Sequence, residues 1–152
     1  MDYVDGHLEE RNMGDWDHSE LQSALLTYLR NHARNWGVYA VAECRLQVRQ
    51  DRYRVPDVMV VSRSEKPKKI VRQAPILCVE VLSPNDTFHR IQSRVDDYVA
   101  MGVKDVWVLS PLDGRVFTVA NGRQQFVNDR ILTVAGTEIA VDLDTIKAEI
   151  DD

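Results

Sequence analysis

Two short apolar runs that read as buried β-strands each carry a carboxylate, and this combination constrains the fold more than any other feature. Asp57 lies in residues 54–61 (RVPDVMVV), and Glu80 lies in residues 76–82 (ILCVEVL). A carboxylate is rarely buried unless it is paired or binds a metal, because removing its water costs several kcal/mol. We therefore expect the two runs to be adjacent strands, with Asp57 and Glu80 supplying oxygen ligands to one divalent cation.

The same two acids have a purely structural interpretation, in which each is bonded to arginines and no metal is involved. Glu43 is a candidate third metal ligand, because residues 38–48 alternate like a half-buried strand and Glu43 falls on its polar face. A solvent-facing Glu43 paired with Arg45 or Arg54 fits the pattern equally well. Both alternatives stay open on the sequence.

The size and composition of the chain fit one globular domain over residues 1–152. Hydrophobic residues make up 44% of the chain and charged residues 28%, as in ordinary soluble proteins. No apolar run approaches the roughly 20 residues that span a bilayer, and the acidic start MDYVD is unlike a signal peptide. Cys44 and Cys78 lie in apolar runs, so we expect reduced thiols and a cytoplasmic location rather than a disulfide.

Positive charge is concentrated around Asp57. The chain has a net charge of −5, yet residues 45–72 hold nine basic and three acidic side chains, a local net charge of +6. A basic field beside an acidic site is what a polyanionic substrate requires. The candidate nucleic-acid-binding residues in this block are Arg45, Arg54, Lys68 and Lys69. The simpler interpretation is a hairpin and a loop with ordinary solvent-exposed cations.

The order of the predicted elements indicates an α/β sandwich. A first helix begins with a capping box at Asp17 and Glu20 and ends at Gly37, and a second helix covers residues 87–101. Strands are expected at residues 38–48, 54–61, 76–82, 106–109 and 116–119, with shorter pieces at 125–127, 131–134 and 139–143 and a terminal helix at 144–150. This order predicts a central mixed β-sheet flanked by helices, with an added C-terminal β-hairpin region.

The second helix places an arginine on its apolar side. At about 100° per residue, Arg94 lies on the stripe formed by Ile91 and Val95, whereas Asp97 points away from it. Arginine keeps its charge, so an inward Arg94 needs an anionic partner, and a carboxylate of the expected site is the natural one. The alternative is a side chain that runs along the helix edge to solvent.

Three further residues have structural roles as their first interpretation. His18 opens the first helix, where a cap or surface role is favoured over catalysis. Tyr98 and Trp107 are expected in the core, because large aromatic side chains dominate packing. The chain has no Ser-His-Asp order, no CxxC pair and no Gly-rich phosphate loop, so those enzyme classes lack support.

Several motifs occur in the order typical of one protein family. They are Pro56-Asp57-Val58, Val79-Glu80-Val81-Leu82-Ser83-Pro84, Arg94-Val95-Asp96-Asp97-Tyr98, Gly102-Val103 and Val106-Trp107-Val108-Leu109-Ser110-Pro111, with weaker matches at Asp5-Gly6-His7-Leu8-Glu9 and His18. On these motifs, which span nearly the whole chain, the sequence resembles the Uma family of restriction-endonuclease-like proteins, a branch of the PD-(D/E)XK nuclease superfamily.

The resemblance implies a restriction-endonuclease-like sandwich in which Asp57 and Glu80 bind Mg²⁺, or Mn²⁺, and DNA is hydrolysed. The superfamily lysine expected two residues after Glu80 is replaced by Leu82. The Uma family carries its lysine on the following helix, where this chain has Arg94, and the implied catalytic set is therefore Asp57, Glu80 and Arg94. Arginine is a poor general base, because its pKa exceeds about 12.

This departure keeps two other functions open beside DNA cleavage. One is a weakened nuclease fold that binds metal or nucleic acid without cutting, and the other is a partner-binding scaffold. The sequence leaves the oligomeric state open, with a homodimer as one alternative, because exposed strand edges in such folds often pair.

Overall fold

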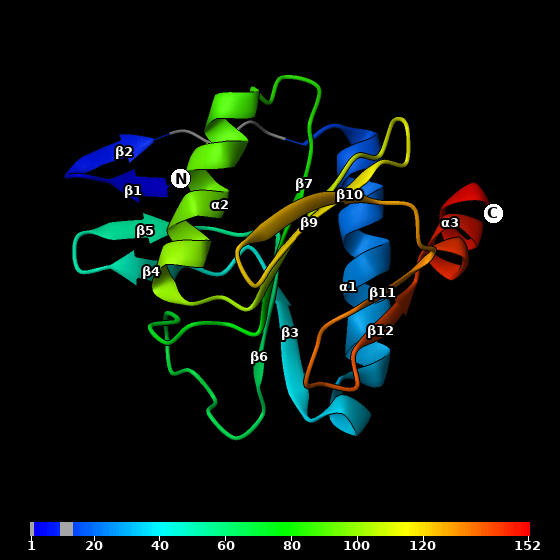
Figure 1. Ribbon diagram of the computed structural model, residues 1–152, viewed down its shortest axis with the longest axis horizontal. Helices are drawn as coiled ribbons and strands as arrows, with labels where there is room; N and C mark the ends of the chain where they lie inside the picture. The colour runs from blue at the N-terminus through cyan, green and yellow to red at the C-terminus, as the bar shows by residue number, and fades with distance from the viewer. Residues whose placement is uncertain (1, 10–13) are drawn as a thin grey trace.

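The computed structural model describes residues 2–9 and 14–152 and has a central mixed sheet with helices on both sides (Figure 1). The sheet has six strands in the order β10-β9-β8-β7-β6-β3. Their bounds are β3 (Val38–Ala42), β6 (Val58–Ser62), β7 (Leu77–Val81), β8 (Asp105–Leu109), β9 (Val116–Ala120) and β10 (Arg123–Val127). Strands β7 and β8 are parallel, and the other neighbouring pairs are antiparallel. The predicted fold class is confirmed.

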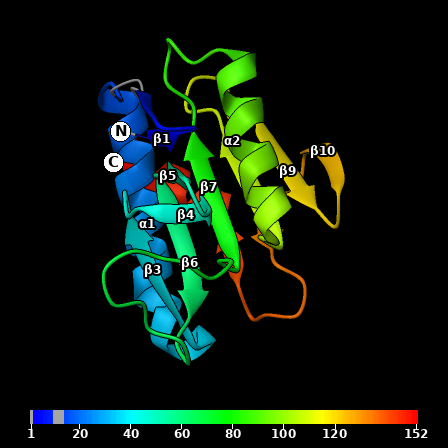
Figure 2. The ribbon, with the colours of Figure 1, turned by 90° about the vertical axis from the view of Figure 1, so that its left-hand side faces the viewer.

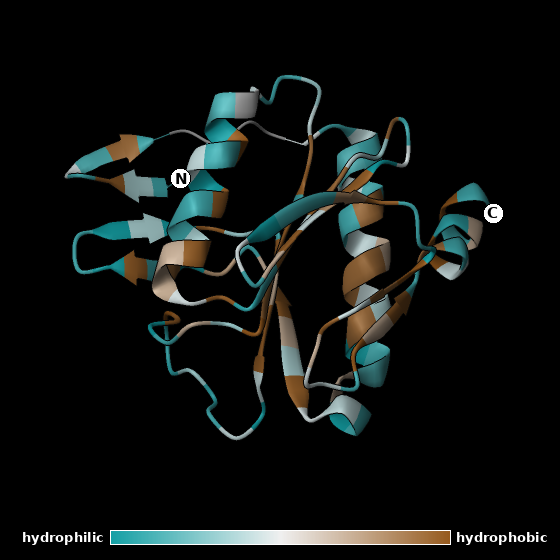
Figure 3. Ribbon diagram, viewed as in Figure 1, coloured by the Kyte–Doolittle hydropathy of each residue, from teal (hydrophilic) through white to brown (hydrophobic). Residues whose placement is uncertain are grey.

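Side chains on alternate positions of the strands enter two separate cores, one on each face of the sheet. On β7, Leu77 and Val79 pack in the core that contains α1 (Trp16–Trp36), whereas Cys78 packs in the core that contains α2 (Phe88–Met101). Figures 1 and 2 show the two helices on opposite faces of the sheet. Because both faces are covered, the central strands are hydrophobic along their length, as the brown ribbon of Figure 3 shows.

The two long helices have well-defined ends. The N-cap of α1 is Asp15, whose side chain accepts a hydrogen bond from the His18 backbone N–H at 3.0 Å, so the predicted cap at Asp17 is two residues too late. Gly37 ends α1 as predicted, with φ of 69° in the left-handed region. Gly102 ends α2 in the same way, with φ of 101°. These ends let α2 follow β7 directly and pack back across the sheet.

Residues 38–48 do not form the continuous strand that their alternation predicts. Glu43 has φ of +53°, and there the chain leaves the central sheet for a second sheet with strand order β2-β1-β5-β4. The strands of this second sheet are β1 (Asp2–Val4), β2 (His7–Glu9), β4 (Leu46–Arg49) and β5 (Arg52–Arg54). Strands β4 and β5 form the predicted antiparallel hairpin, and the sheet lies beside α2 (Figure 1).

The C-terminal segment packs on the α1 side of the molecule. Strands β11 (Ile131–Thr133) and β12 (Ala140–Asp142) pair antiparallel and lead into α3 (Leu143–Asp151). Val141 and Ile146 from this segment are buried in the same core as α1. The C-terminal hairpin is therefore part of the hydrophobic core. Among the described residues, no helix combines the length and the hydrophobicity needed to cross a membrane.

Candidate active site

Asp57 and Glu80 both lie at the end of the sheet where β6 begins and β7 ends. The paired register of β6 and β7 ends at Val58 and Val79, and Asp57 and Glu80 are the next residues along the chain from that last pair. Both acids are buried, with exposed fractions of 2% and 1%. The two acid-bearing strands are thus neighbours as expected, while the role of the acids as metal ligands stays a prediction.

The Asp57 carboxylate is oriented by groups from β7 and α1. Its Oδ2 atom accepts a hydrogen bond from the Val81 backbone N–H at 2.7 Å and lies 3.3 Å from His18 Nε2. His18 is 8% exposed, so it points into the protein from the first turn of α1. The expected cap or surface role of its side chain is therefore wrong. Its partner lies 39 residues away, and no local pattern signals such a contact.

Two side chains of α2 reach Glu80. The Tyr98 hydroxyl donates to Glu80 Oε1 at 2.5 Å, and Arg94 Nη1 lies 3.8 Å from Glu80 Oε2. Burial, together with the nearby Glu80 carboxylate, raises the pKa of Tyr98 well above its ordinary value. The hydroxyl consequently stays protonated and remains a donor. Tyr98 is in the core, as expected, and it also positions one of the two acids.

Arg94 points inward, as the helical spacing predicts, and it connects two carboxylates. Its side chain is buried, with 5% exposed. Its Nε donates to Asp2 Oδ2 at 3.2 Å, while its Nη1 faces Glu80 Oε2. Burial by itself lowers the pKa of Arg94, but the negative charges of Glu80 and Asp2 outweigh it and raise that pKa. Arg94 therefore stays charged beside the site. Asp2 has no sequence signal that reveals this role.

Arg54 is buried, so its predicted contact with nucleic acid is wrong. It is 1% exposed and donates to Asp97 Oδ2 at 2.7 Å and to Asp2 Oδ2 at 3.0 Å. Burial alone lowers the pKa of Arg54, but its hydrogen bonds to Asp97 and Asp2 raise it overall. Its guanidinium thus ties the second sheet to α2. The other candidate nucleic-acid-binding residues are exposed: Arg45, Lys68 and Lys69.

Glu43 does not complete a three-acid site. It is exposed, and within residues 2–9 and 14–152 no group of three or more His, Cys, Asp or Glu side chains is arranged to hold a metal. The left-handed turn at Glu43 moves its side chain off the strand face on which it was expected. Its backbone N–H instead donates to the Asp57 carbonyl at 3.2 Å. Asp57 and Glu80 still fit Mg²⁺, which commonly takes one or two carboxylates together with waters and substrate phosphate.

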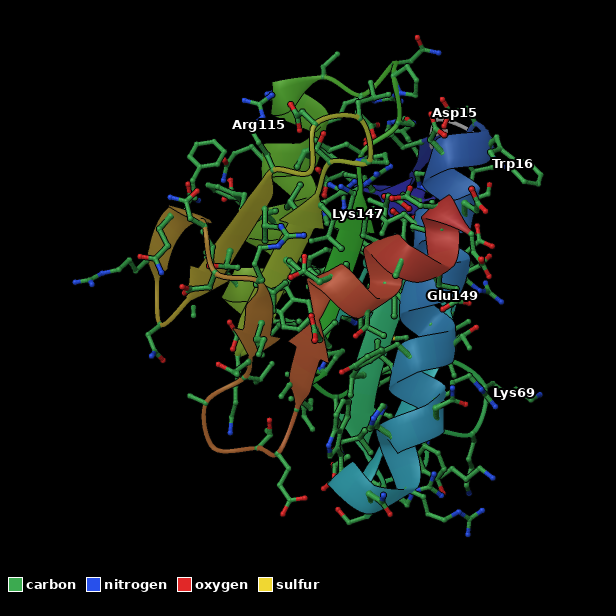
Figure 4. All side chains as sticks on the ribbon, turned by 90° about the vertical axis from the view of Figure 1, so that its right-hand side faces the viewer. Asp15, Trp16, Lys69, Arg115, Lys147 and Glu149 are labelled. Carbon is green, nitrogen blue, oxygen red and sulfur yellow. The ribbon has the colours of Figure 1, made fainter. Side chains whose placement is uncertain are left out.

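A groove of about 640 Å³ adjoins this end of the sheet. It is lined by Leu109 at the carboxyl end of β8, and Leu109 pairs with Val81, whose N–H holds Asp57. Asp17 of α1 and Lys147 of α3 line its other side, and Figure 4 shows Lys147 on α3. Ligands of α/β proteins commonly bind at the carboxyl ends of parallel strands, and this groove lies at the carboxyl end of β8, but neither Asp57 nor Glu80 lines it.

Comparisons with known proteins agree with this fold. The chain is similar to the crystal structure of a putative nuclease belonging to DUF820 from Anabaena variabilis ATCC 29413, with a TM-score of 0.86 and 19% identity over 98% of this chain and 90% of that chain. It is also similar to part of a chain in a cryoEM structure of a DrdV–DNA complex, with a TM-score of 0.50 and 13% identity over 88% of this chain and 11% of that chain. At such identities the likeness shows the fold alone.

The sequence itself gives the family. No curated protein matches the chain significantly. A family model described as Uma2, putative restriction endonuclease, matches residues 1–144. This match covers the whole six-stranded sheet and both long helices, and it includes Asp57, Glu80 and Arg94. The chain belongs to the Uma2 family of restriction-endonuclease-like proteins.

Proposed function

We propose that this protein is an endonuclease that hydrolyses DNA phosphodiester bonds with Mg²⁺, or Mn²⁺ in its place, held by Asp57 and Glu80. The observation that carries the proposal is the presence of two buried carboxylates at the same end of adjacent strands, with the charged Arg94 next to one of them. Membership of a restriction-endonuclease-like family supports nuclease chemistry. The likeness to part of a protein solved in a DNA complex is consistent with DNA as the partner.

The surrounding residues fix both carboxylates for this purpose. When bound, Mg²⁺ supplies positive charge to the phosphate and lowers the pKa of a water. The Val81 N–H and His18 contact the Asp57 carboxylate, and the Tyr98 hydroxyl of α2 donates to the Glu80 carboxylate. Such outer contacts orient metal ligands and sustain metal affinity.

Arg94 has an electrostatic role in the proposed reaction. Because the charges of Glu80 and Asp2 favour its protonated form, Arg94 does not accept a proton from water. A permanent positive charge within the site favours a bound phosphate and the negative charge that develops on it. The site thus offers charge stabilisation from Arg94 and oxygen ligands from the two acids.

Binding without cleavage is the second candidate function, and the residues at two positions favour it. Leu82 stands where the superfamily has a lysine, and Arg94 stands where the family has one, so neither position supplies a general base. Such a protein would bind DNA with an affinity that falls steeply as the salt concentration rises, while leaving the strands intact.

Nicking of supercoiled plasmid DNA in Mg²⁺ or Mn²⁺ separates the two functions. An endonuclease should nick the plasmid and lose this activity in Asp57→Ala and Glu80→Ala, whereas Glu138→Ala, an exposed acid far along the chain, should keep it. A mobility shift without nicking supports the binding function. If the protein neither nicks the plasmid nor shifts its mobility, both proposals are contradicted.

A further inference from the structure

A second, strongly basic pocket lies along β3, an end strand of the central sheet. Its volume is about 240 Å³, and its lining includes four cationic side chains and no Asp or Glu. The cations are Arg30, Arg63, Lys66 and Lys69. They come from α1 and from the loop that follows β6, and Figure 4 shows Lys69 extending outward beside α1.

Two of the cations are held in place by the backbone of β3. Arg30 Nη1 donates to the Ala40 carbonyl at 3.0 Å, and Arg63 Nε donates to the Val38 carbonyl at 3.2 Å. A guanidinium has five N–H groups, so each arginine keeps further donors for a ligand. Because these bonds fix both guanidinium groups beforehand, an anion would bind with less loss of side-chain freedom.

The other side of the pocket is built on an aromatic ring. The Arg63 guanidinium carbon lies 4.2 Å from the centre of the Tyr39 ring, and Lys66 Nζ lies 5.7 Å from it. These contacts hold two of the cations over the ring, so their charges face the pocket together. In the ranges 2–9 and 14–152, none of the four forms an ion pair with a carboxylate.

We propose that this pocket is a binding site for a phosphate group. Arginine forks and lysine ammonium groups are the side chains that recognise phosphate oxygens, and the pocket presents both with no opposing carboxylate in its lining. Its volume lies below the roughly 300–1,000 Å³ typical of sites for drug-sized ligands, so it suits a phosphate group with little else enclosed.

This site is distinct from the pair of acids. Arg63 directly follows β6 and Asp57 directly precedes it, and a strand of that length separates them by about 20 Å at roughly 3.3 Å per residue. The phosphate therefore belongs either to a DNA backbone that extends well beyond the cleavage position or to a free nucleotide. The site does not depend on cleavage, because its arginines are held by the backbone of β3 and by Tyr39 rather than by the acid pair.

Calorimetric titration with inorganic phosphate tests the pocket directly. The variant is Lys66→Gln with Lys69→Gln, because both side chains line the pocket and are exposed, so the fold tolerates their replacement. Lys104→Gln with Arg123→Gln removes the same charge from exposed positions outside the pocket and is the matched control. We expect the pocket variant to bind phosphate at least about tenfold more weakly and the control to bind it as the natural protein does.

Competition experiments then identify the source of the phosphate. Displacement of inorganic phosphate by a DNA duplex assigns the pocket to the nucleic-acid backbone, and the slope of log affinity against log salt should fall by about 1–2 in the pocket variant. Displacement by a mononucleotide but not by the duplex assigns it to a free nucleotide. Either result supports the phosphate site. Equal phosphate affinity in the pocket variant and the control, or no phosphate binding by the natural protein, would overturn it.

Discussion

Replacing Asp2 with alanine should remove a shared partner of two buried arginines. Asp2 is 0% exposed and accepts hydrogen bonds from Arg54 at 3.0 Å, from Arg94 at 3.2 Å and from the Val55 N–H at 3.1 Å. Removing one partner of a buried ion pair costs about 3–5 kcal/mol, because a charge is left uncompensated. Each arginine keeps a second carboxylate, so we expect a loss near the lower limit, about 3 kcal/mol in the free energy of unfolding.

Urea unfolding measures this loss, and Asp5 provides a matched control. For a domain of this size an m-value of about 1–3 kcal/mol/M converts the loss to a midpoint lower by about 1–3 M. Asp5 also binds two arginines, Arg49 and Arg52, both at 2.6 Å, but its side chain is 58% exposed. Water screens exposed pairs, so Asp5→Ala should cost far less than Asp2→Ala. Equal losses in the two variants would refute the argument from burial.

Three further substitutions test other contacts of the site and the core. Tyr98→Phe removes the hydroxyl that donates to Glu80 at 2.5 Å and should lower the free energy of unfolding by about 1.5–3 kcal/mol, whereas an unchanged urea midpoint would contradict this contribution. Burial raises the pKa of Asp105 from 3.8 to about 6. The contribution of its protonated form to stability is therefore fully present below pH 3.8 and is lost as the pH rises through about 6. Asp105→Asn should thus be more stable than the natural protein by about 3 kcal/mol at about pH 8 and similar to it at about pH 4, and a difference that does not change with pH would argue against this cause. His18→Ala should weaken Mg²⁺ binding about 10–100-fold, because His18 contacts Asp57, and equal affinity would show that the contact does not support the metal.

Local periodicity predicts the parts of the structure that depend on one element at a time. The inward position of Arg94 follows from its place beside Ile91 and Val95 on one side of a helix. The strands of Asp57 and Glu80 follow from continuous apolar runs, since the central sheet is covered on both faces. The fold class follows from the order of these elements along the chain.

Local periodicity does not predict contacts between segments that are far apart in the sequence. Arg54 meets Asp2 across 52 residues and His18 meets Asp57 across 39 residues, and neither arginine nor histidine carries a local mark that separates a buried position from an exposed one. The turn at Glu43 is not predicted by the sequence pattern for a different reason. Leu46 is buried on the far side of the turn, so the polar and apolar alternation continues although the chain has changed sheets.

Binding of Mg²⁺ through Asp57 and Glu80 is the central claim, and calorimetric titration of Mg²⁺ or Mn²⁺ into the natural protein and Asp57→Ala tests it most directly. The natural protein should bind one ion and should also unfold at a higher temperature when the ion is added, with a stabilisation of about 2.7 kcal/mol at 100 times the dissociation constant. Asp57→Ala should show neither effect, and Glu138→Ala should show both. The same metal affinity in Asp57→Ala as in the natural protein would contradict the claim.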